Sequence, residues 1–372
     1  MKIAVLDFLM GDNGKGRWAH YFSKDADYVI RTSGAGNCGH VIWRDGKKYT
    51  HHILPSADYR NPNIKSYLGH GMYINPDELL EEILGFSKDF PGVAKTIIVD
   101  PDAFVITDAH ITEDKEKNGH IGSTNKGVGP AAISKFGRTG TRLYHLIRDK
   151  APVIEKLKEL GVRFIPVLKM QEEFEKSNLV FEGSQGSAID VSVGIDYPFV
   201  TSSDCTVSGI YSSGFHFVHL NRVYGAGKPY LTKSGNGKMI TEIHGEEASA
   251  LRLAGGERGA TTGRDRRIGY LDLPMSKYGI KKSGITHILM SKLDIMNGNK
   301  FIRVCNSYNK EVNSAGDFEQ IEPSYIDLPG WNDGMNRREI IPFLKYVEEY
   351  CKTPVAFTSA GVNDEDVVRF GE

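Results

Sequence analysis

Short apolar runs, each bounded by polar or glycine-rich segments, recur from the start of the chain to its end. Runs of this length between turn residues are typical of buried β-strands. They predict strands over residues 3–9, 28–33, 96–100, 164–168, 179–183, 286–294 and 355–361.

In other segments the apolar residues recur three and four positions apart, which predicts amphipathic helices over 17–26, 76–90, 142–161 and 337–351. Residues 227–243 and 299–316 resemble hairpin-like excursions, and Asp45 and Gly46 form a predicted tight turn in a β-rich stretch. This alternation predicts an α/β protein with a largely parallel sheet and functional loops at the carboxyl ends of its strands. Because no repeat or linker interrupts the pattern, we expect a single domain over residues 1–372.

Composition narrows the class of protein. Hydrophobic residues make up 40% and charged residues 25% of the chain, which is ordinary globular usage. The net charge of −1 argues against nucleic acid as a partner. Four cysteines without paired spacing argue against a zinc site or a disulfide framework and favour a reducing compartment. Since no long apolar run occurs, we expect a soluble, cytoplasmic protein without a membrane segment.

A glycine-rich segment follows the first predicted strand and reads MGDNGKGRW over residues 10–18. A turn of this kind before a helix presents backbone N–H groups that suit an anion. The glycine spacing does not fit a Walker A loop. At this stage a phosphate site and a plain strand-to-helix turn both remain open.

A literal GxGxxG pattern occurs at residues 34–39, but a dinucleotide site requires a helix to begin there. Here β-rich residues follow, which excludes that interpretation. The loop still delivers Asn37 and His40 to the end of a strand, where a lone histidine is more often structural than catalytic.

Further loops carry candidate chemistry. Residues 120–130 offer Ser123, Thr124 and Lys126 as phosphate donors, although an ordinary turn is the simpler interpretation. The stretches 181–186 and 197–206 place Gln185 and Thr201 after strands, where an amide or hydroxyl can bind a base or ribose.

Residues 259–272 read GATTGRDRRIGYLD, in which the arginines at 264, 266 and 267 favour an anion site over a solvated basic loop. At the end of an apolar strand, Lys292 and Asp294 are spaced as in folds that bind GTP. A carboxylate there can accept hydrogen bonds from guanine N1–H and its 2-amino group, and a surface ion pair is the alternative.

Taken together, the motifs GDNGKGR, GNCGH, HHILPS, IGSTNKGVGP, FEGSQG, YPFVTSS, GATTGRDRR, SKLD and LPGW resemble the adenylosuccinate synthetase family over nearly the whole chain. The resemblance implies a P-loop-NTPase-like α/β fold and a ligase that joins L-aspartate to C6 of IMP. It further implies GTP as phosphoryl donor, Mg²⁺ as cofactor and a 6-phosphoryl intermediate. It makes the segment at residues 10–18 both a phosphate cradle and a catalytic loop.

The resemblance also assigns roles to residues. Asp12 matches the general base at N1 and, with the carbonyl of Gly39, a Mg²⁺ ligand, and His40 matches the acid. Lys135 and Gln185 complete the catalytic candidates. Phosphate binding is expected at Lys15 and the backbone of Gly14, Gly16 and Arg17, and further nucleotide contacts are expected at Gly11, Asn13, Asn37 and Val41. The acceptor nucleotide is expected at Thr124, Thr201, Arg264 and Arg138, the last from a neighbouring subunit of a homodimer. Aspartate is expected at Ala260, Thr261, Thr262, Arg264 and Arg266, and guanine at Lys292, Asp294, Thr358, Ser359 and Ala360.

The chain also departs from the family pattern. Asn13 replaces an acid, Asp265 replaces an arginine, and Ser234 replaces a valine. With the short chain, these traits resemble compact phage-borne relatives that use dGMP to make 2-aminoadenine nucleotides, some with ATP-type donors. Because Asp12 and Asp294 are retained, we expect a GTP-dependent enzyme acting on IMP, with dGMP as the alternative acceptor. A GTP-binding module without chemistry is the alternative from another class, and the pair of Asp12 and His40 argues against it.

Overall fold

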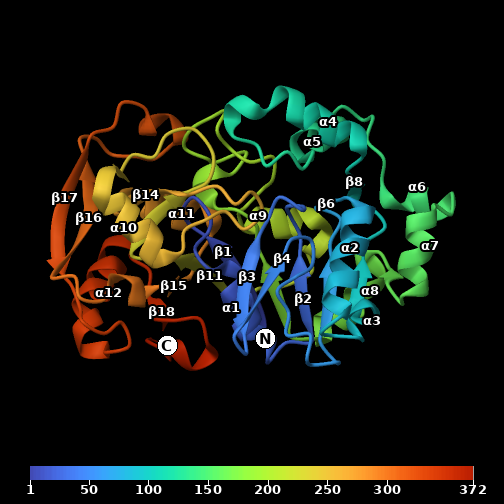
Figure 1. Cartoon of the computed structure of the whole chain (residues 1–372), viewed down its shortest axis with the longest axis horizontal. Helices are drawn as coiled ribbons and strands as arrows, with labels where there is room; N and C mark the ends of the chain where they lie inside the picture. The colour runs from blue at the N-terminus through green and yellow to red at the C-terminus, as the bar shows by residue number, and fades with distance from the viewer. Residues whose placement is uncertain (372) are drawn as a thin grey trace.

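A ten-stranded sheet forms the centre of the computed structural model, which describes residues 1–371 (Figure 1). Neighbouring strands pair in parallel throughout, except that β18 and β19 are antiparallel, so the predicted largely parallel sheet is confirmed. The strands in spatial order are β19 (Val367–Arg369), β18 (Val355–Ser359), β15 (His287–Met290), β11 (Arg222–Gly227), β1 (Lys2–Asp7), β10 (Leu179–Glu182), β2 (Tyr28–Arg31), β5 (Lys65–Leu68), β7 (Ile97–Val99) and β9 (Arg163–Phe164).

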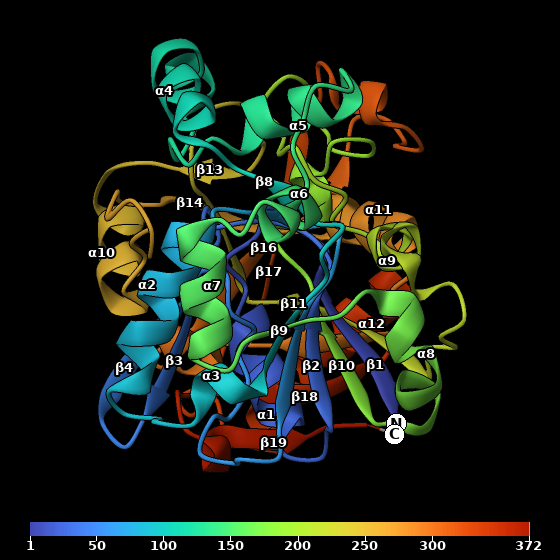
Figure 2. The ribbon, with the colours of Figure 1, turned by 90° about the vertical axis from the view of Figure 1, so that its right-hand side faces the viewer.

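Helices cover both faces of this sheet, as Figure 2 shows from the side. Along β1 the side chains alternate between two cores, with Ala4 and Leu6 in one and Ile3 and Val5 in the other. One face packs against α1 (Lys15–Ser23), α2 (Pro76–Ser87), α3 (Val93–Thr96), α6 (Leu143–Arg148) and α7 (Pro152–Glu159). The other packs against α8 (Val167–Lys176), α11 (Leu273–Ser283) and α12 (Arg337–Cys351). Because both faces are buried, the strands are continuous apolar runs.

The carboxyl-terminal half of the chain also forms a smaller sheet. It consists of β12 (Tyr230–Lys233), β14 (Arg267–Asp272), β16 (Phe301–Tyr308) and β17 (Pro323–Pro329), with β13 (Glu242–Ile243) also on β14, and α10 (Gly245–Gly255) packs nearby. The predicted hairpin at 227–243 is wrong, because β12 and β13 each pair antiparallel with β14 rather than with each other. The predicted excursion at 299–316 contains β16, whose antiparallel partner β17 lies beyond it.

The elements that lie at or near the carboxyl ends of the parallel strands are β6 (Tyr73–Ile74), β8 (Phe104–Val105), α4 (Asp108–Lys117), α5 (Val128–Phe136) and α9 (Val207–Ile210) (Figure 1). The hairpin of β3 (His40–Arg44) and β4 (Lys47–His51) runs alongside α1. The predicted turn between β3 and β4 is confirmed, with positive φ of 51° at Asp45 and 74° at Gly46. A strand rather than a helix therefore follows the GxGxxG pattern, which confirms that it is no dinucleotide fingerprint.

Some local predictions differ from the structure. The helix expected over 142–161 is two helices, α6 and α7, because Pro152 begins a new helix and disfavours helical backbone before it. In the predicted strand 164–168 only Phe164 is extended in β9, and α8 begins at Val167. The sequence pattern missed β5 and β11, and β11 carries Gly227 because an added Cβ would lie 2.4 Å from the Phe8 ring.

Candidate functional site

The loops that follow β1, β2 and β10 meet at one edge of the sheet and, with the loop before β14, surround a cavity of about 420 Å³. Parallel strands direct their carboxyl ends to one edge, so these distant segments converge there. The sequence-predicted residues that line it are Gly11, Asp12, Lys15, Asn37, Gly39, His40, Thr124, Gln185, Thr201, Ala260, Thr261, Thr262 and Arg264. Asn236, from the segment between β12 and β13, lines it too.

The buried carboxylate of Asp7 organises the loop after β1. Its oxygens accept from the N–H groups of Leu9 at 2.9 Å and Gly11 at 3.3 Å, and from the Asn13 amide at 2.9 and 3.0 Å. Lys15 lies 3.1 Å from the same carboxylate and is 3% exposed. The loop is therefore ordered by an internal anion, and Lys15 is held at the amino end of α1.

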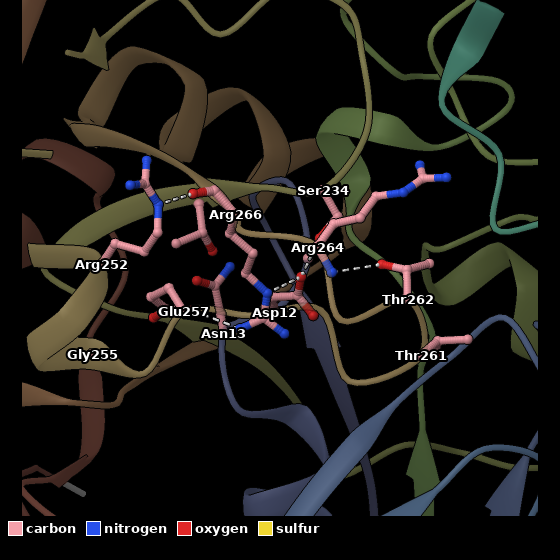
Figure 3. Close-up of polar contacts among 12 residues, drawn as sticks. Asp12, Asn13, Ser234, Arg252, Gly255, Glu257, Thr261, Thr262, Arg264 and Arg266 are labelled. Atoms are coloured by element: carbon pink, nitrogen blue, oxygen red, sulfur yellow. Dashed lines mark hydrogen bonds and ion pairs between the residues drawn. The ribbon is translucent and has the colours of Figure 1, made fainter. Parts of the chain in front are cut away.

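Asp12 lies at the tip of this loop with a left-handed φ of 61°. Its Oδ2 accepts from the Ser234 hydroxyl at 3.1 Å and lies 2.9 Å from Nε of Arg266 (Figure 3). The carboxylate is thus oriented into the cavity by an ion pair. Arg266, expected to bind aspartate, contacts Asp12 and Glu257 in this structure and does not line the cavity.

His40 begins β3, and its Nδ1 lies 2.5 Å from Oε1 of Glu182, the last residue of β10. The other oxygen of Glu182 accepts from the backbone N–H of Ser56 at 2.8 Å. Burial lowers the pKa of His40, and Glu182 partly offsets this. Burial would raise the pKa of Glu182, but His40 and Arg31 hold it at about 2. Glu182 therefore stays ionised and fixes the imidazole so that Nε2 is left for another partner.

The loop that carries His40 touches the arginine-rich loop directly. An added Cβ on Gly39 would lie 2.6 Å from Cβ of Ala260 and 3.0 Å from Oγ1 of Thr261. The Thr261 hydroxyl lies 3.3 Å from the carbonyl oxygens of both Asn37 and Cys38. Gly39 is therefore required for the close approach of two loops that are far apart in sequence.

Two of the predicted site residues, Lys135 and Arg138, do not line the first cavity. Lys135 lines an adjoining cavity of about 1160 Å³, which Thr201 also lines, and burial lowers its pKa. Arg138 is exposed just after α5 with a φ of 63° and does not line either cavity, although its neighbour Gly137 lines the second. The hydroxyl of Ser123, which also lines the first cavity, donates to Asp114, and Nζ of Lys126 donates to Glu78, so both candidates for phosphate binding are paired within the chain.

The expected guanine residues lie together at the carboxyl ends of β15 and β18, where Met290 pairs with Thr358. Nζ of Lys292 donates to the Gly255 carbonyl at 2.7 Å and to Glu257 at 2.8 Å, so it does not pair with Asp294. Within residues 1–371, Oδ1 of Asp294 is buried and has no hydrogen-bond partner. Burial raises the pKa of Asp294. A buried carboxylate oxygen without a donor is unfavourable, so this position favours a ligand that donates.

The remaining predicted residues support the loops. Asn13 is buried, Gly14 has a left-handed φ of 90° before α1, and the Arg17 side chain binds Asp364 at 3.1 Å. The expected cradle is thus the backbone of residues 14–17.

Sequence reasoning missed several buried ionic residues: Asp7, Glu182, Lys228 and Glu257. A usable signal existed for the first two, because each is an acid at the end of an apolar strand that leads into a glycine-rich loop. Glu257 lies in an irregular segment, where no periodic pattern marks it.

Comparison with known proteins points to one family. The family model for adenylosuccinate synthetase matches residues 4–175 and 153–368. Adenylosuccinate synthetases of Petrotoga mobilis and Finegoldia magna are 35% and 33% identical, over 98% and 99% of this chain and 96% and 97% of theirs. The structure of fully ligated adenylosuccinate synthetase from Plasmodium falciparum superposes with a TM-score of 0.87 at 29% identity, covering 100% of both chains.

A second solved structure shares the fold. It is the succinoaminodeoxyadenylate synthetase (PurZ) of cyanophage S-2L bound to dGMP and dATP, with a TM-score of 0.73 at 22% identity, over 99% of this chain and 94% of that one.

Fold, cavity and relatives define the molecule as a ligase that forms a carbon–nitrogen bond. More particularly, the chain belongs to the adenylosuccinate synthetase family, which joins L-aspartate to IMP with the use of GTP.

Proposed function

We propose that this chain joins L-aspartate to C6 of IMP in a reaction that needs GTP and Mg²⁺ and passes through a 6-phosphoryl intermediate. The observation that carries the proposal is the meeting of Asp12, His40 and Arg264 at one cavity, although they come from three separate loops. A module that only binds nucleotide needs no base beside an oriented histidine.

In the first step Asp12 takes the N1 proton, which makes O6 nucleophilic. O6 then bonds to the γ-phosphorus of GTP as the bond to the β-phosphate oxygen breaks and GDP leaves. His40, whose Nδ1–H donates to Glu182, donates from Nε2 as the imidazolium, the form that the negative phosphates of bound GTP favour, to the charge that develops at O6 and the phosphoryl group. In the second step the amine of aspartate bonds to C6, the bond between C6 and O6 breaks, and inorganic phosphate leaves with the proton that the nitrogen loses.

Binding of aspartate prepares Asp12 for this role. The carboxylates of aspartate take the guanidinium groups of Arg264 and Arg266, so the 2.9 Å contact between Arg266 and Asp12 opens. Ala260, Thr261 and Thr262 close over aspartate, while Gln185, Thr124, Thr201 and Lys135 hold the acceptor nucleotide.

GTP lies along the other side of Asp12. The backbone of Gly14, Gly16 and Arg17, with Lys15, holds its phosphates. Lys292, Asp294 and the segment of Thr358, Ser359 and Ala360 hold its base.

Mg²⁺ fits these residues when phosphates complete its shell. Among residues 1–371 no three metal-ligating side chains form a cluster, and Mg²⁺ characteristically uses one or two carboxylates together with phosphates and water. Asp12 and the carbonyl of Gly39 would hold the ion, which would neutralise charge on the transferring phosphates.

We further propose that the active unit is a homodimer in the cytoplasm, with Arg138 completing the neighbouring site. Arg138 is exposed at the end of α5, whose Ile133 and Phe136 are 70% and 78% exposed. Apolar side chains this exposed on one helix favour a protein contact. Within residues 1–371, no helix is long and apolar enough to cross a membrane.

The test is ligation by the purified chain with GTP, Mg²⁺ and L-aspartate and an equal mixture of IMP, GMP and dGMP, read by product mass. Formation of adenylosuccinate supports the proposal. Exclusive formation of a 2-amino product would assign the chain to the phage type, and nucleotide binding without any product would leave only a binding module. Repeating the assay with ATP and dATP tests the donor.

A further inference from the structure

Glu257 is a buried carboxylate that no step of the proposed reaction uses. It lies just after α10, and its side chain is fully buried. Oε1 accepts from Lys228 at 2.8 Å, from Tyr230 at 2.7 Å and from Lys292 at 2.8 Å. Oε2 accepts from Arg266 at 2.6 Å. A carboxylate with its acceptor sites this fully used is held rigidly.

The cationic partners of Glu257 each belong to a different loop of the proposed site. Lys292 lies two residues before Asp294, in the segment assigned to guanine. Arg266 lies in the loop assigned to aspartate, and its Nε faces Asp12 (Figure 3). Lys228 follows β11, and its ammonium also donates to the backbone carbonyl of Asp12 at 3.1 Å. The side chain of Glu257 thus contacts residues of the proposed GTP segment and the proposed aspartate loop, and a lysine that also binds the backbone of Asp12.

The charges show why these contacts depend on one another. Three cations surround Glu257, and the carboxylate of Asp12 is the other anion that contacts one of them. Burial lowers the pKa of Lys228 to about 8, and Glu257 opposes this. If Arg266 moves toward the carboxylates of aspartate, Glu257 is left to Lys228, Tyr230 and Lys292 and holds them more firmly. If guanine instead draws Lys292 away, Glu257 holds Arg266 more firmly.

We propose that Glu257 is a positioning residue that couples occupation of the guanine site to occupation of the aspartate site through Lys292 and Arg266. This rests on the proposed function, because it takes the assignment of the two loops from it. Since binding energies are linked reciprocally, aspartate then changes the affinity for GTP by the same factor as GTP changes the affinity for aspartate.

The test measures this factor directly. The probe is guanosine 5′-(β,γ-imido)triphosphate with Mg²⁺, titrated by calorimetry into full-length protein saturated with IMP, with and without L-aspartate. In the wild type we expect aspartate to raise the dissociation constant about five-fold or more, within the usual range for coupled sites, because Glu257 then holds Lys292 more firmly. In Glu257→Gln, which keeps the shape but removes the charge, we expect the two dissociation constants to agree within about two-fold.

Two further variants make the result specific. Tyr230→Phe removes the neutral donor to Oε1 and leaves all charges, so it should retain the wild-type factor. Glu257→Asp keeps the charge on a shorter side chain and should give an intermediate factor, and it replaces Glu257→Gln if thermal unfolding shows that the latter does not fold.

Equal coupling in Glu257→Gln and the wild type, or no coupling in a wild type that makes adenylosuccinate, overturns the positioning role alone. A wild type that makes no adenylosuccinate overturns the proposed function instead.

Discussion

Asp294 is half-buried, and its buried Oδ1 has no donor within residues 1–371, so its binding depends on the donors that a ligand offers. Guanine offers N1–H and a 2-amino group. In Asp294→Asn each charge-assisted hydrogen bond lost costs about 1.5–3 kcal/mol, so kcat/KM for GTP should fall about 10- to 150-fold. Xanthosine triphosphate, which presents a C2 oxygen to the new amide, should become the better donor.

The measurement is initial ligation rate against donor concentration for both nucleotides. Asp366→Asn is the matched control, because it removes a neighbouring charge without touching the buried carboxylate. An unchanged preference for GTP in Asp294→Asn would remove Asp294 from base recognition.

The lowered pKa of Glu182 predicts how the stability of the fold depends on pH in acid. Its pKa is about 2 in the folded chain against a usual 4.5, so the folded state binds fewer protons between these values. Its stabilisation is therefore present above about pH 4.5 and lost as pH falls toward 2, with a magnitude of about 3 kcal/mol. In urea titrations at stepped pH, the free energy of unfolding of Glu182→Gln should fall less steeply with pH over this range than that of the wild type. The difference in slope should correspond to the uptake of up to one proton on unfolding. Parallel slopes for variant and wild type would contradict this.

At the scale of elements, the contact between the loop after β2 and the loop before β14 depends on Gly39. Its φ needs no glycine, so Gly39→Ala tests the space alone. A Cβ 2.6 Å from Ala260 must push the aspartate loop away, since carbon atoms pack at about 3.5–4.0 Å. We expect KM for aspartate to rise about ten-fold or more, because small misplacements of binding groups are costly.

Steady-state kinetics with aspartate as the varied substrate measure this effect. Gly85→Ala is the control, because Gly85 lies within α2 with nothing within 4 Å of an added Cβ. That change should leave KM unaltered and stabilise the helix by about 0.5–1 kcal/mol. If KM for aspartate stays at the wild-type value in Gly39→Ala, the two loops do not act together.

The elements also show what a single sequence can predict. The helix expected over 337–351 is α12 with the same bounds, because apolar positions at helical spacing report directly on a buried face. The partners of β12 and β13 could not be predicted, since both pair with a strand more than twenty residues away from β12. In the site, motif residues such as Asp12 and His40 could be placed at the cavity. The buried acids that orient them could not, because burial of a charge depends on tertiary contacts.

At the scale of the whole molecule, the proposed dimer predicts complementation between inactive variants. His40→Ala lacks the histidine and Arg138→Ala lacks the residue proposed to reach the neighbouring site, so each alone should ligate poorly. In a mixed dimer one site receives both intact residues. After subunit exchange an equal mixture should therefore regain about a quarter of wild-type activity. A mixture no more active than its parents would place Arg138 in its own subunit's site or outside catalysis.

The order of strands in the central sheet has a consequence for how such an enzyme can diversify. The residues proposed to bind guanine lie at the ends of β15 and β18 at one side, Asp12 follows β1 in the middle, and Gln185 and Asn37 follow β10 and β2 beyond it. On the proposed assignment, the residues that select the phosphoryl donor and those that select the acceptor follow separate strands, and the reacting atoms lie between them. A lineage can exchange one nucleotide for another by altering loops at one flank while the chemistry, anchored to a strand in the interior of the sheet, is inherited unchanged.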